Sequence, residues 1–107
     1  MIVRIWHGYT TKEKADIYEN LLKEEVFVGI EKMHVKGYRD IQLLRRDLED
    51  EVEFTTVMRF DNIESVKQFA GEDYEAAYVP ANARKILKRF DDRSIHCQLL
   101  YELQYNA

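Results

Sequence analysis

Apolar residues recur along this chain with two different periods, and the change of period marks the predicted elements. Residues 2–6 form a β-branched and aromatic run that ends before Gly8, which predicts a first strand. Apolar residues then recur at steps of three and four, which places them on one face of a helix of about six turns. This face comprises Tyr18, Leu21, Leu22, Val26, Ile30 and Met33.

The start of this helix carries a capping signal. Thr10 is followed three residues later by Glu13. In such a capping box the hydroxyl and the carboxylate each satisfy a backbone amide that is left free at a helix start. We therefore expect the helix to begin after Thr10.

Two strand-like runs, residues 41–46 and 52–60, follow the helix, and the acidic stretch 47–51 joins them. In the second run, Val52, Phe54, Thr56, Met58 and Phe60 alternate with Glu53, Thr55, Val57 and Arg59. This pattern predicts an antiparallel hairpin. Asp61 and Glu64 can cap a second helix that Gly71 ends. Its inner side would carry Val66, Phe69 and Ala70.

The C-terminal third predicts one more helix and one more strand. Pro80 suits the first turn of a helix because its missing amide costs nothing there. Ala83, Leu87 and Phe90 would give this helix an apolar edge. Residues 95–103 alternate again, which predicts a last strand.

The order of main elements is strand, helix, strand, strand, helix, strand. This is the split βαβ or ferredoxin-like motif, an α+β fold with helices on one face of a four-stranded antiparallel sheet. Both faces of the sheet carry apolar residues, for example Val3 and Ile5 on one side and Ile2 and Trp6 on the other. An uncovered apolar face is rarely tolerated. We therefore expect a homodimer with sheet facing sheet.

Length and charge narrow the class of protein. A chain of 107 residues suits one domain over residues 1–107, and the formal charge of −4 with scattered basic residues excludes nucleic acid as a partner. We find neither a signal peptide nor an apolar run of membrane-spanning length. Cys97 is the one cysteine, which suits a reducing compartment. The chain is expected to be cytoplasmic, with no membrane partner.

Metal and nucleotide sites are not indicated. His7, His34 and His96 lie on or beside different elements, without metal-ligand spacing, and the glycines do not form a dinucleotide fingerprint. His96 and Cys97 are neighbours on a strand, so they point to opposite faces and do not form a dyad. We expect Cys97 to be a small core residue.

Several side chains have two readings. Trp6, Phe54, Phe69, Tyr74 and Tyr78 would form either the aromatic walls of a cavity or plain core.

Four polar side chains also have more than one possible role. Arg4 and Arg45 would reach the sheet edge, pair with a carboxylate such as Glu53 or Glu102, or bind an anionic ligand. The ring nitrogens of His96 would find hydrogen-bond partners within the protein, or His96 would belong to a functional site. His7 would line the mouth of a pocket or be solvated.

Five segments together resemble one branch of the antibiotic biosynthesis monooxygenase-like family, whose members are dimeric α+β barrels. The resemblance spans nearly the whole chain. The segments are Arg4-Ile5-Trp6-His7-Gly8, Phe69-Ala70-Gly71-Glu72-Asp73-Tyr74, Ala77-Tyr78-Val79-Pro80, Phe90-Asp91 and His96.

The resemblance implies a cofactor-independent monooxygenase that holds a small phenol or quinol between the sheet and the second helix and lets its anion react with dioxygen. His7 or His96 would be the base, and Arg45 or Tyr78 would stabilise the anion. The residues that would bind the substrate are Trp6, Phe54, Phe60, Phe69 and Tyr74.

The chain departs from the family at two places. Phe60 stands where many members carry tryptophan, which keeps an aromatic wall but loses the indole N–H. The haem-degrading members need an asparagine on the first strand, where Trp6 or His7 stands here. Two alternatives stay open: a non-catalytic dimeric module that binds a small apolar or weakly acidic molecule, and an isomerase or decarboxylase on the same scaffold.

Overall fold

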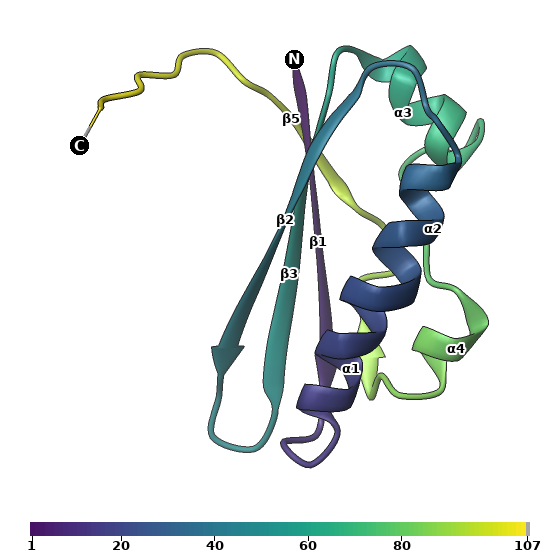
Figure 1. Cartoon of the computed structure of the whole chain (residues 1–107), viewed down its shortest axis with the longest axis vertical. Helices are drawn as coiled ribbons and strands as arrows, with labels where there is room; N and C mark the ends of the chain where they lie inside the picture. Colours follow the sequence, from purple (N-terminus) through teal and green to yellow (C-terminus); the bar gives the residue numbers. More distant parts are fainter. Residues whose placement is uncertain (107) are drawn as a thin grey trace.

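The structure is a computed structural model that describes residues 1–106, so Ala107, the last residue of the expected domain, lies outside the described residues. The helices lie on one side of the sheet and leave its other face without a covering element (Figure 1). The elements in chain order are β1 (Ile2–Thr10), α1 (Ala15–Leu21), the π-helical turn Leu22–Val26, α2 (Phe27–Lys32), β2 (Tyr38–Asp47), β3 (Val52–Phe60), α3 (Ile63–Ala70), α4 (Ala81–Arg84), β4 (Arg89–Phe90) and β5 (Ile95–Gln98).

The sheet has the predicted topology. Its order is β2-β3-β1-β4, every pairing is antiparallel, and β1 and β3 are in register from Ile2 opposite Phe60 to Thr10 opposite Val52. The predicted fourth strand is two short strands, because β4 pairs with one end of β1 and β5 with the other along the same edge. The ferredoxin-like α+β fold is confirmed, with five strands within residues 1–106 in place of four.

One helical rod runs from α1 through the π-helical turn into α2, and its apolar face is the predicted one. Tyr18, Leu22, Val26 and Ile30 are buried, whereas Met33 lies beyond the end of α2 and is exposed.

The predicted helix start is wrong. Thr10 is the last residue of β1, and its hydroxyl donates to the carbonyl of Ile86 at 2.7 Å, so it is not available to cap a helix. The helix begins at Ala15 after Lys14, without a side-chain cap.

The central hairpin and α3 follow the sequence pattern closely. β3 has the predicted bounds, and β2 extends beyond the predicted run at both ends. The cap of α3 is Asn62, whose Oδ1 accepts from the amide of Ser65, and not Asp61 or Glu64, because Asp61 is ion-paired with Arg39. Gly71 ends the helix with a φ of 91°, as expected.

The C-terminal third departs most from the prediction. The helix after Pro80 is a single turn, and Phe90 lies in β4 instead of on a helical edge. The last strand ends at Gln98, so the predicted strand over 95–103 is wrong beyond that point. Residues 99–106 lead away from the sheet on the side opposite the helices (Figure 1). Cys97 is exposed and is not the core residue that we expected.

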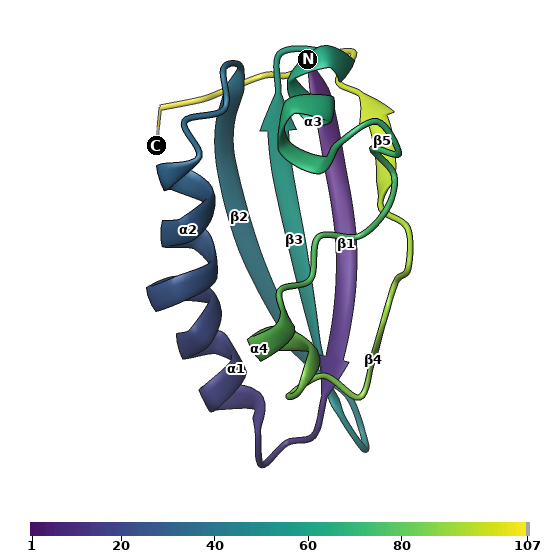
Figure 2. The same cartoon turned by 90° about the vertical axis from the view of Figure 1, so that its right-hand side faces the viewer.

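The core lies between the sheet and the helical layer. Figure 2 views this layer and shows the α1–α2 rod on the β2 side, with α3 and α4 over the centre of the sheet. Tyr18, Phe54 and Phe60 are the largest fully buried side chains, and the rings of Tyr18 and Phe54 meet edge to face at 5.0 Å. Within residues 1–106, no helix has both the length and the apolar character needed to cross a membrane.

Gly8 gives the indole of Trp6 its place in this core. A Cβ at Gly8 would stand 2.5 Å from Cη2 of Trp6 and 3.2 Å from a methyl group of Leu87. The indole N–H donates to the carbonyl of Asp91 at 2.9 Å, so the ring is held on both sides. Only a residue without a side chain leaves room for this packing.

We therefore predict that Gly8→Ala destabilises the protein, by about 1–3 kcal/mol as for other overpacked cores. The matched control is Gly29→Ala, because a Cβ at Gly29 meets open space in α2 and should stabilise the helix by about 0.5–1 kcal/mol. Urea unfolding followed by the fluorescence of Trp6, the one tryptophan, measures both. Equal midpoints for Gly8→Ala and the parent would contradict the packing argument.

Candidate functional site

A hollow lies between the sheet and the helical layer, where side chains of β1, β3, the helical rod, α3 and residues 78–83 converge. Its wall is mostly apolar, with Trp6, Met58 and Phe69 among its residues, and the free volume inside is about 40 Å³. That volume holds a few water molecules. The hollow thus lies where the family resemblance implies a substrate, but in this conformation side chains leave little free space inside it.

The helical rod changes its geometry where it borders the hollow. The π-helical turn spans Leu22–Val26, and both of its end residues line the wall. Single π-helical turns inside α-helices are rare and frequently occur at functional sites. The wider turn is therefore an independent indication that this part of the rod is shaped around the hollow.

Arg4 brings a positive charge into this apolar surrounding. Arg4 lines the hollow and is only 3% exposed. Its guanidinium carbon Cζ lies over the ring of Phe69, 5.3 Å from the ring centroid. Its N–H groups donate to the carbonyls of Tyr74 at 2.5 Å and Ala76 at 2.9 Å, and one nitrogen is 3.0 Å from Nε2 of His96.

This charge has no carboxylate partner in the described chain. None of the ion pairs formed within residues 1–106 includes Arg4. Burial lowers the pKa of the guanidinium to about 10, so the group remains charged at neutral pH. A buried cation without a counter-charge is costly. The hollow is therefore suited to an anion.

His96 is neutral in this arrangement, and the position of its proton follows from its partner. A guanidinium only donates, so Nε2 of His96 must accept and the ring proton must lie on Nδ1. Burial, and then the charge of Arg4, lower the pKa of His96. Nδ1 is buried and has no hydrogen-bond partner within residues 1–106.

Ser94 adds a second polar group. It is 5% exposed, it lines the hollow, and its hydroxyl has no hydrogen-bond partner within the described part of the chain. Arg4 and Ser94, together with the hydroxyl-bearing residues Tyr18, Thr56 and Tyr78, give this mostly apolar wall its polar groups. Among residues 1–106, no Asp, Glu, His, Cys or Lys side chain lines the hollow. The wall consequently carries donors for an anion but no obvious proton acceptor.

The structure brings together only part of the set predicted to bind the substrate. Trp6 and Phe69 line the hollow. Phe54 and Phe60 are completely buried in the core and do not reach its wall. Tyr74 packs its ring edge to face against His96 at 5.2 Å and contributes its carbonyl to Arg4.

The predicted catalytic residues are more widely separated. Tyr78 is 40% exposed and lines the hollow, and its ring packs against that of Phe69 at a tilt of 51° with the centroids 5.0 Å apart. His96 reaches the hollow only through Arg4.

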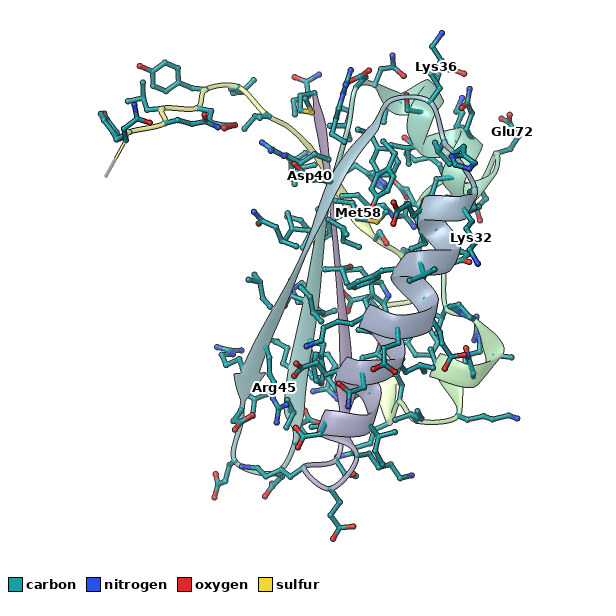
Figure 3. All side chains as sticks on the ribbon, in the orientation of Figure 1. Lys32, Lys36, Asp40, Arg45, Met58 and Glu72 are labelled. Atoms are coloured by element: carbon teal, nitrogen blue, oxygen red, sulfur yellow. The ribbon has the colours of Figure 1, made fainter. Side chains whose placement is uncertain are left out.

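The other two lie elsewhere. Arg45 binds Asp16 at 2.8 Å and Glu19 at 3.1 Å, and Figure 3 shows it near the hairpin end, away from Met58. His7 lies on the open face, with Nδ1 2.8 Å from Oδ2 of Asp91.

Sequence reasoning left the role of Arg4 undecided and did not identify Ser94 as a candidate. The signal for Arg4 was its inward register on β1, two residues before Trp6, since both side chains then point to the helical layer. Ser94 offered no signal, because a serine in the polar stretch 91–94 reads as an ordinary turn residue. Within residues 1–106, no three His, Cys, Asp or Glu side chains are grouped to hold a metal ion.

Comparison with known proteins bears on the fold. No family model and no curated protein matches the sequence. A solved protein of Bacillus cereus, described provisionally as an antibiotic biosynthesis monooxygenase, is similar with a TM-score of 0.67 and 10% identity, over 99% of this chain and 98% of that one. Rv0793 from Mycobacterium tuberculosis is similar with a TM-score of 0.57 and 14% identity, over 97% and 100%. The resemblance to the antibiotic biosynthesis monooxygenase-like family is confirmed for the fold.

The lowered pKa of His96 predicts a loss of stability in acid. An unfolded histidine takes up a proton as the pH falls through about 6.5, whereas folded His96 takes it up only at lower pH. The stabilisation that neutral His96 gives the folded state is therefore complete above pH 6.5 and decreases below it. We predict that His96→Gln, whose amide oxygen can still accept from Arg4, makes the free energy of unfolding depend less on pH between pH 7 and pH 5 than it does in the parent.

The matched control is His34→Gln, because His34 is an exposed residue beyond α2. Unfolding in urea at a series of pH values measures the effect. If the His96→Gln and His34→Gln variants both lost stability in acid to the same extent as the parent, the assignment of a neutral, half-buried imidazole to His96 would be contradicted.

Proposed function

We propose that this chain is a small oxygenase that binds an aromatic molecule with an acidic hydroxyl in the hollow and lets its anion react with dioxygen. The observation that supports this proposal is Arg4, a buried cation without a carboxylate partner in a wall that also contains Trp6 and Phe69. An ionised phenol matches both parts of this wall. Its ring would pack on the aromatic residues and its oxygen would face the guanidinium.

Arg4 and Ser94 would stabilise the anion. Hydrogen bonds to charged groups are worth about 1.5–3 kcal/mol, which favours the ionised form of a bound phenol. Since no wall residue within 1–106 is a carboxylate or a histidine, the substrate would have to lose its proton to water on binding. The activity would therefore be restricted to phenols that are already fairly acidic. His96 would be a positioning residue that holds Arg4.

The oxidation would need no external reductant. In an anthrol-type anion the ring carbon opposite the oxygen is electron-rich, and dioxygen would add there to form a carbon–oxygen bond and a peroxide. Loss of water would leave a carbonyl, so that CH₂ and O₂ give C=O and H₂O, with all four electrons from the substrate. The protein need only position the ring, stabilise the anion and exclude bulk water.

An aromatic ligand requires the hollow to open. Typical ligand pockets measure about 300–1,000 Å³, far more than the 40 Å³ that is free here. A shallow groove on the outer side shares Val26, Tyr78 and Pro80 with the hollow, so these three side chains separate the hollow from the groove. We propose that Tyr78 swings outward to admit the ligand.

The open face of the sheet supports a homodimer. Val3, Ile5 and Val57 point to this face, together with the exposed side chains of Leu44 and Ile95. A contiguous apolar surface on a sheet is a usual site of association. We propose that two copies pack these faces together, while each hollow stays on the outer, helical side.

A non-catalytic binding module is the second candidate. The specific observation in its favour is the absence of a proton acceptor on the wall within residues 1–106. Such a module would use the same cation and the same aromatic side chains, but dioxygen would not react with the bound anion. Binding and turnover must therefore be measured separately.

We predict that Arg4→Met weakens the binding of an acidic anthrol at least tenfold, which corresponds to about 1.4 kcal/mol. The matched control is Arg45→Met, since Arg45 faces the same layer but lies outside the hollow. Quenching of Trp6 fluorescence under nitrogen measures binding, and oxygen uptake under air measures turnover.

The outcomes separate the candidates. Uptake of oxygen that depends on the protein and is lost in Arg4→Met, but kept in Arg45→Met, supports the oxygenase. Saturable quenching without uptake supports the binding module. If Arg4→Met binds as tightly as the parent, Arg4 is not the anion partner and both forms of the proposal fail.

A further inference from the structure

The wall of the hollow contains a second buried hydroxyl besides that of Ser94, and it belongs to Tyr18 of α1. Tyr18 is only 1% exposed and lines the hollow. Among the side-chain hydrogen bonds formed within residues 1–106, none includes this hydroxyl. Buried hydroxyls are normally hydrogen-bonded, because an unpaired polar group in the interior costs free energy. The hydroxyl of Tyr18 is therefore available to a bound molecule.

The geometry of the helical rod keeps Tyr18 on the side of the hollow. Four residues at steps of four line the hollow from the rod, namely Tyr18, Leu22, Val26 and Ile30. An α-helix has 3.6 residues per turn, so residues four apart drift around its axis. The π-helical turn Leu22–Val26 has more residues per turn, which reduces this drift. The unusual turn thus lets one face of the rod point into the hollow from Tyr18 to Ile30.

Tyr18 and Arg4 lie towards opposite ends of the sheet. Arg4 stands opposite Met58 in the pairing of β1 with β3. Tyr18 contacts Phe54, which stands opposite Gly8. These two levels are four residues apart along β1, which is about 13 Å at the rise of an antiparallel strand. Figure 2 agrees, because α1 lies beside one end of the sheet and α3 lies over the other.

An aromatic level separates the two ends. Trp6 stands opposite Thr56 between the level of Arg4 and that of Gly8, and both Trp6 and Thr56 line the hollow. The indole offers a flat apolar surface at this level, which suits an aromatic ring. Along the sheet, the wall therefore offers a cation, then an aromatic surface, then the hydroxyl of Tyr18.

The hydroxyl of Tyr18 is suited to a neutral oxygen. Burial raises the pKa of Tyr18 above its ordinary value, so the group stays protonated at neutral pH and can donate a hydrogen bond. Arg4, the cation that lines the hollow, lies towards the other end, and a second negative charge beside Tyr18 would be costly to bury. A carbonyl oxygen accepts a hydrogen bond without carrying a charge.

We propose that Tyr18 is a specificity-determining residue of the hollow, and that it selects flat aromatic ligands with a neutral acceptor oxygen, such as a carbonyl, at the end remote from the acidic hydroxyl. Tyr18 donates to this oxygen while Arg4 binds the anion, so that the ligand is held in one orientation along the sheet. An analogue without the acceptor leaves a buried donor unpaired and binds more weakly. The inference rests on the proposed function and adds a second contact to it.

Two ligands of equal shape test the inference. In 6-acetyl-2-naphthol an acceptor oxygen lies opposite the hydroxyl, and in 6-isopropenyl-2-naphthol a methylene group replaces that oxygen. Calorimetric titration under nitrogen measures the binding of both to the parent and to Tyr18→Phe. We expect Tyr18→Phe to weaken binding of the acetyl compound about fivefold, as for the loss of one neutral hydrogen bond, and to leave binding of the isopropenyl compound unchanged. The different acidities of the two ligands cancel, because each ligand is compared between two proteins.

The matched control is Tyr38→Phe. Tyr38 also packs on a buried phenylalanine, with its ring centroid 5.5 Å from that of Phe60, but it does not line the hollow. This change should leave the binding of both compounds as in the parent. Urea unfolding without ligand gives a second readout. Tyr18→Phe should not lower the midpoint, because the hydroxyl that it removes binds no side chain or carbonyl within residues 1–106.

The possible failures are distinguishable. If both compounds bind and Arg4→Met weakens both, but Tyr18→Phe weakens them equally or not at all, the inference is wrong and the proposed anion site stands. If the parent binds neither compound, the proposed function fails and the inference fails with it. A selective loss of the acetyl compound in Tyr38→Phe would place its acceptor outside the hollow. A lowered midpoint in Tyr18→Phe would show that the hydroxyl is already paired in the free protein. Either of these last two results would overturn the inference.

Discussion

The structure around the hollow depends on the buried guanidinium of Arg4. Its N–H groups bind the carbonyls of Tyr74 and Ala76, which belong to the connection between α3 and α4. That connection has almost no regular structure of its own, apart from the single bridge between Ala76 and Arg93. Arg4 therefore fixes the backbone that closes the hollow, and the residue that supplies the charge also builds the wall around it.

The central strand divides the molecule into two working surfaces. Arg4, Trp6 and Gly8 point from β1 to the helical layer, whereas Val3, Ile5 and His7 point to the open face. Because the side-chain period of a strand is two, a slip of one residue would exchange the two surfaces. The separation explains why the two histidines that sequence reasoning paired as alternative bases lie on opposite sides of the sheet. It also means that the proposed ligand binding and the proposed association could be altered independently.

Elements that depend on neighbouring residues could be predicted from the sequence. Features that depend on a contact with a residue far away in the chain could not. The hairpin and the Gly71 helix end depend on neighbouring residues, and both were predicted. Thr10 carried a capping signal, but the carbonyl of Ile86, 76 residues away, takes its hydroxyl instead. Arg4 and Arg45 looked equivalent, because only the fold shows that α1 supplies carboxylates to one of them and that the other receives backbone carbonyls and a neutral imidazole. Neither the π-helical turn nor Ser94 left a signal in the sequence.

The alternating pattern over residues 95–103 shows what such a pattern encodes. It records that the segment is compatible with a sheet, but it does not say which strand will be beside it, or in which chain. β5 ends at Gln98, opposite Ile2, the first residue of β1, although the alternation continues to Asn106. A similar argument applies to the hollow. Proteins of very different sequence share this fold, so the fold alone does not determine which chemistry the hollow supports. The wall of this hollow carries the cation of Arg4 but, within residues 1–106, no carboxylate or imidazole side chain, so in the proposed reaction the acidity would have to come from the ligand.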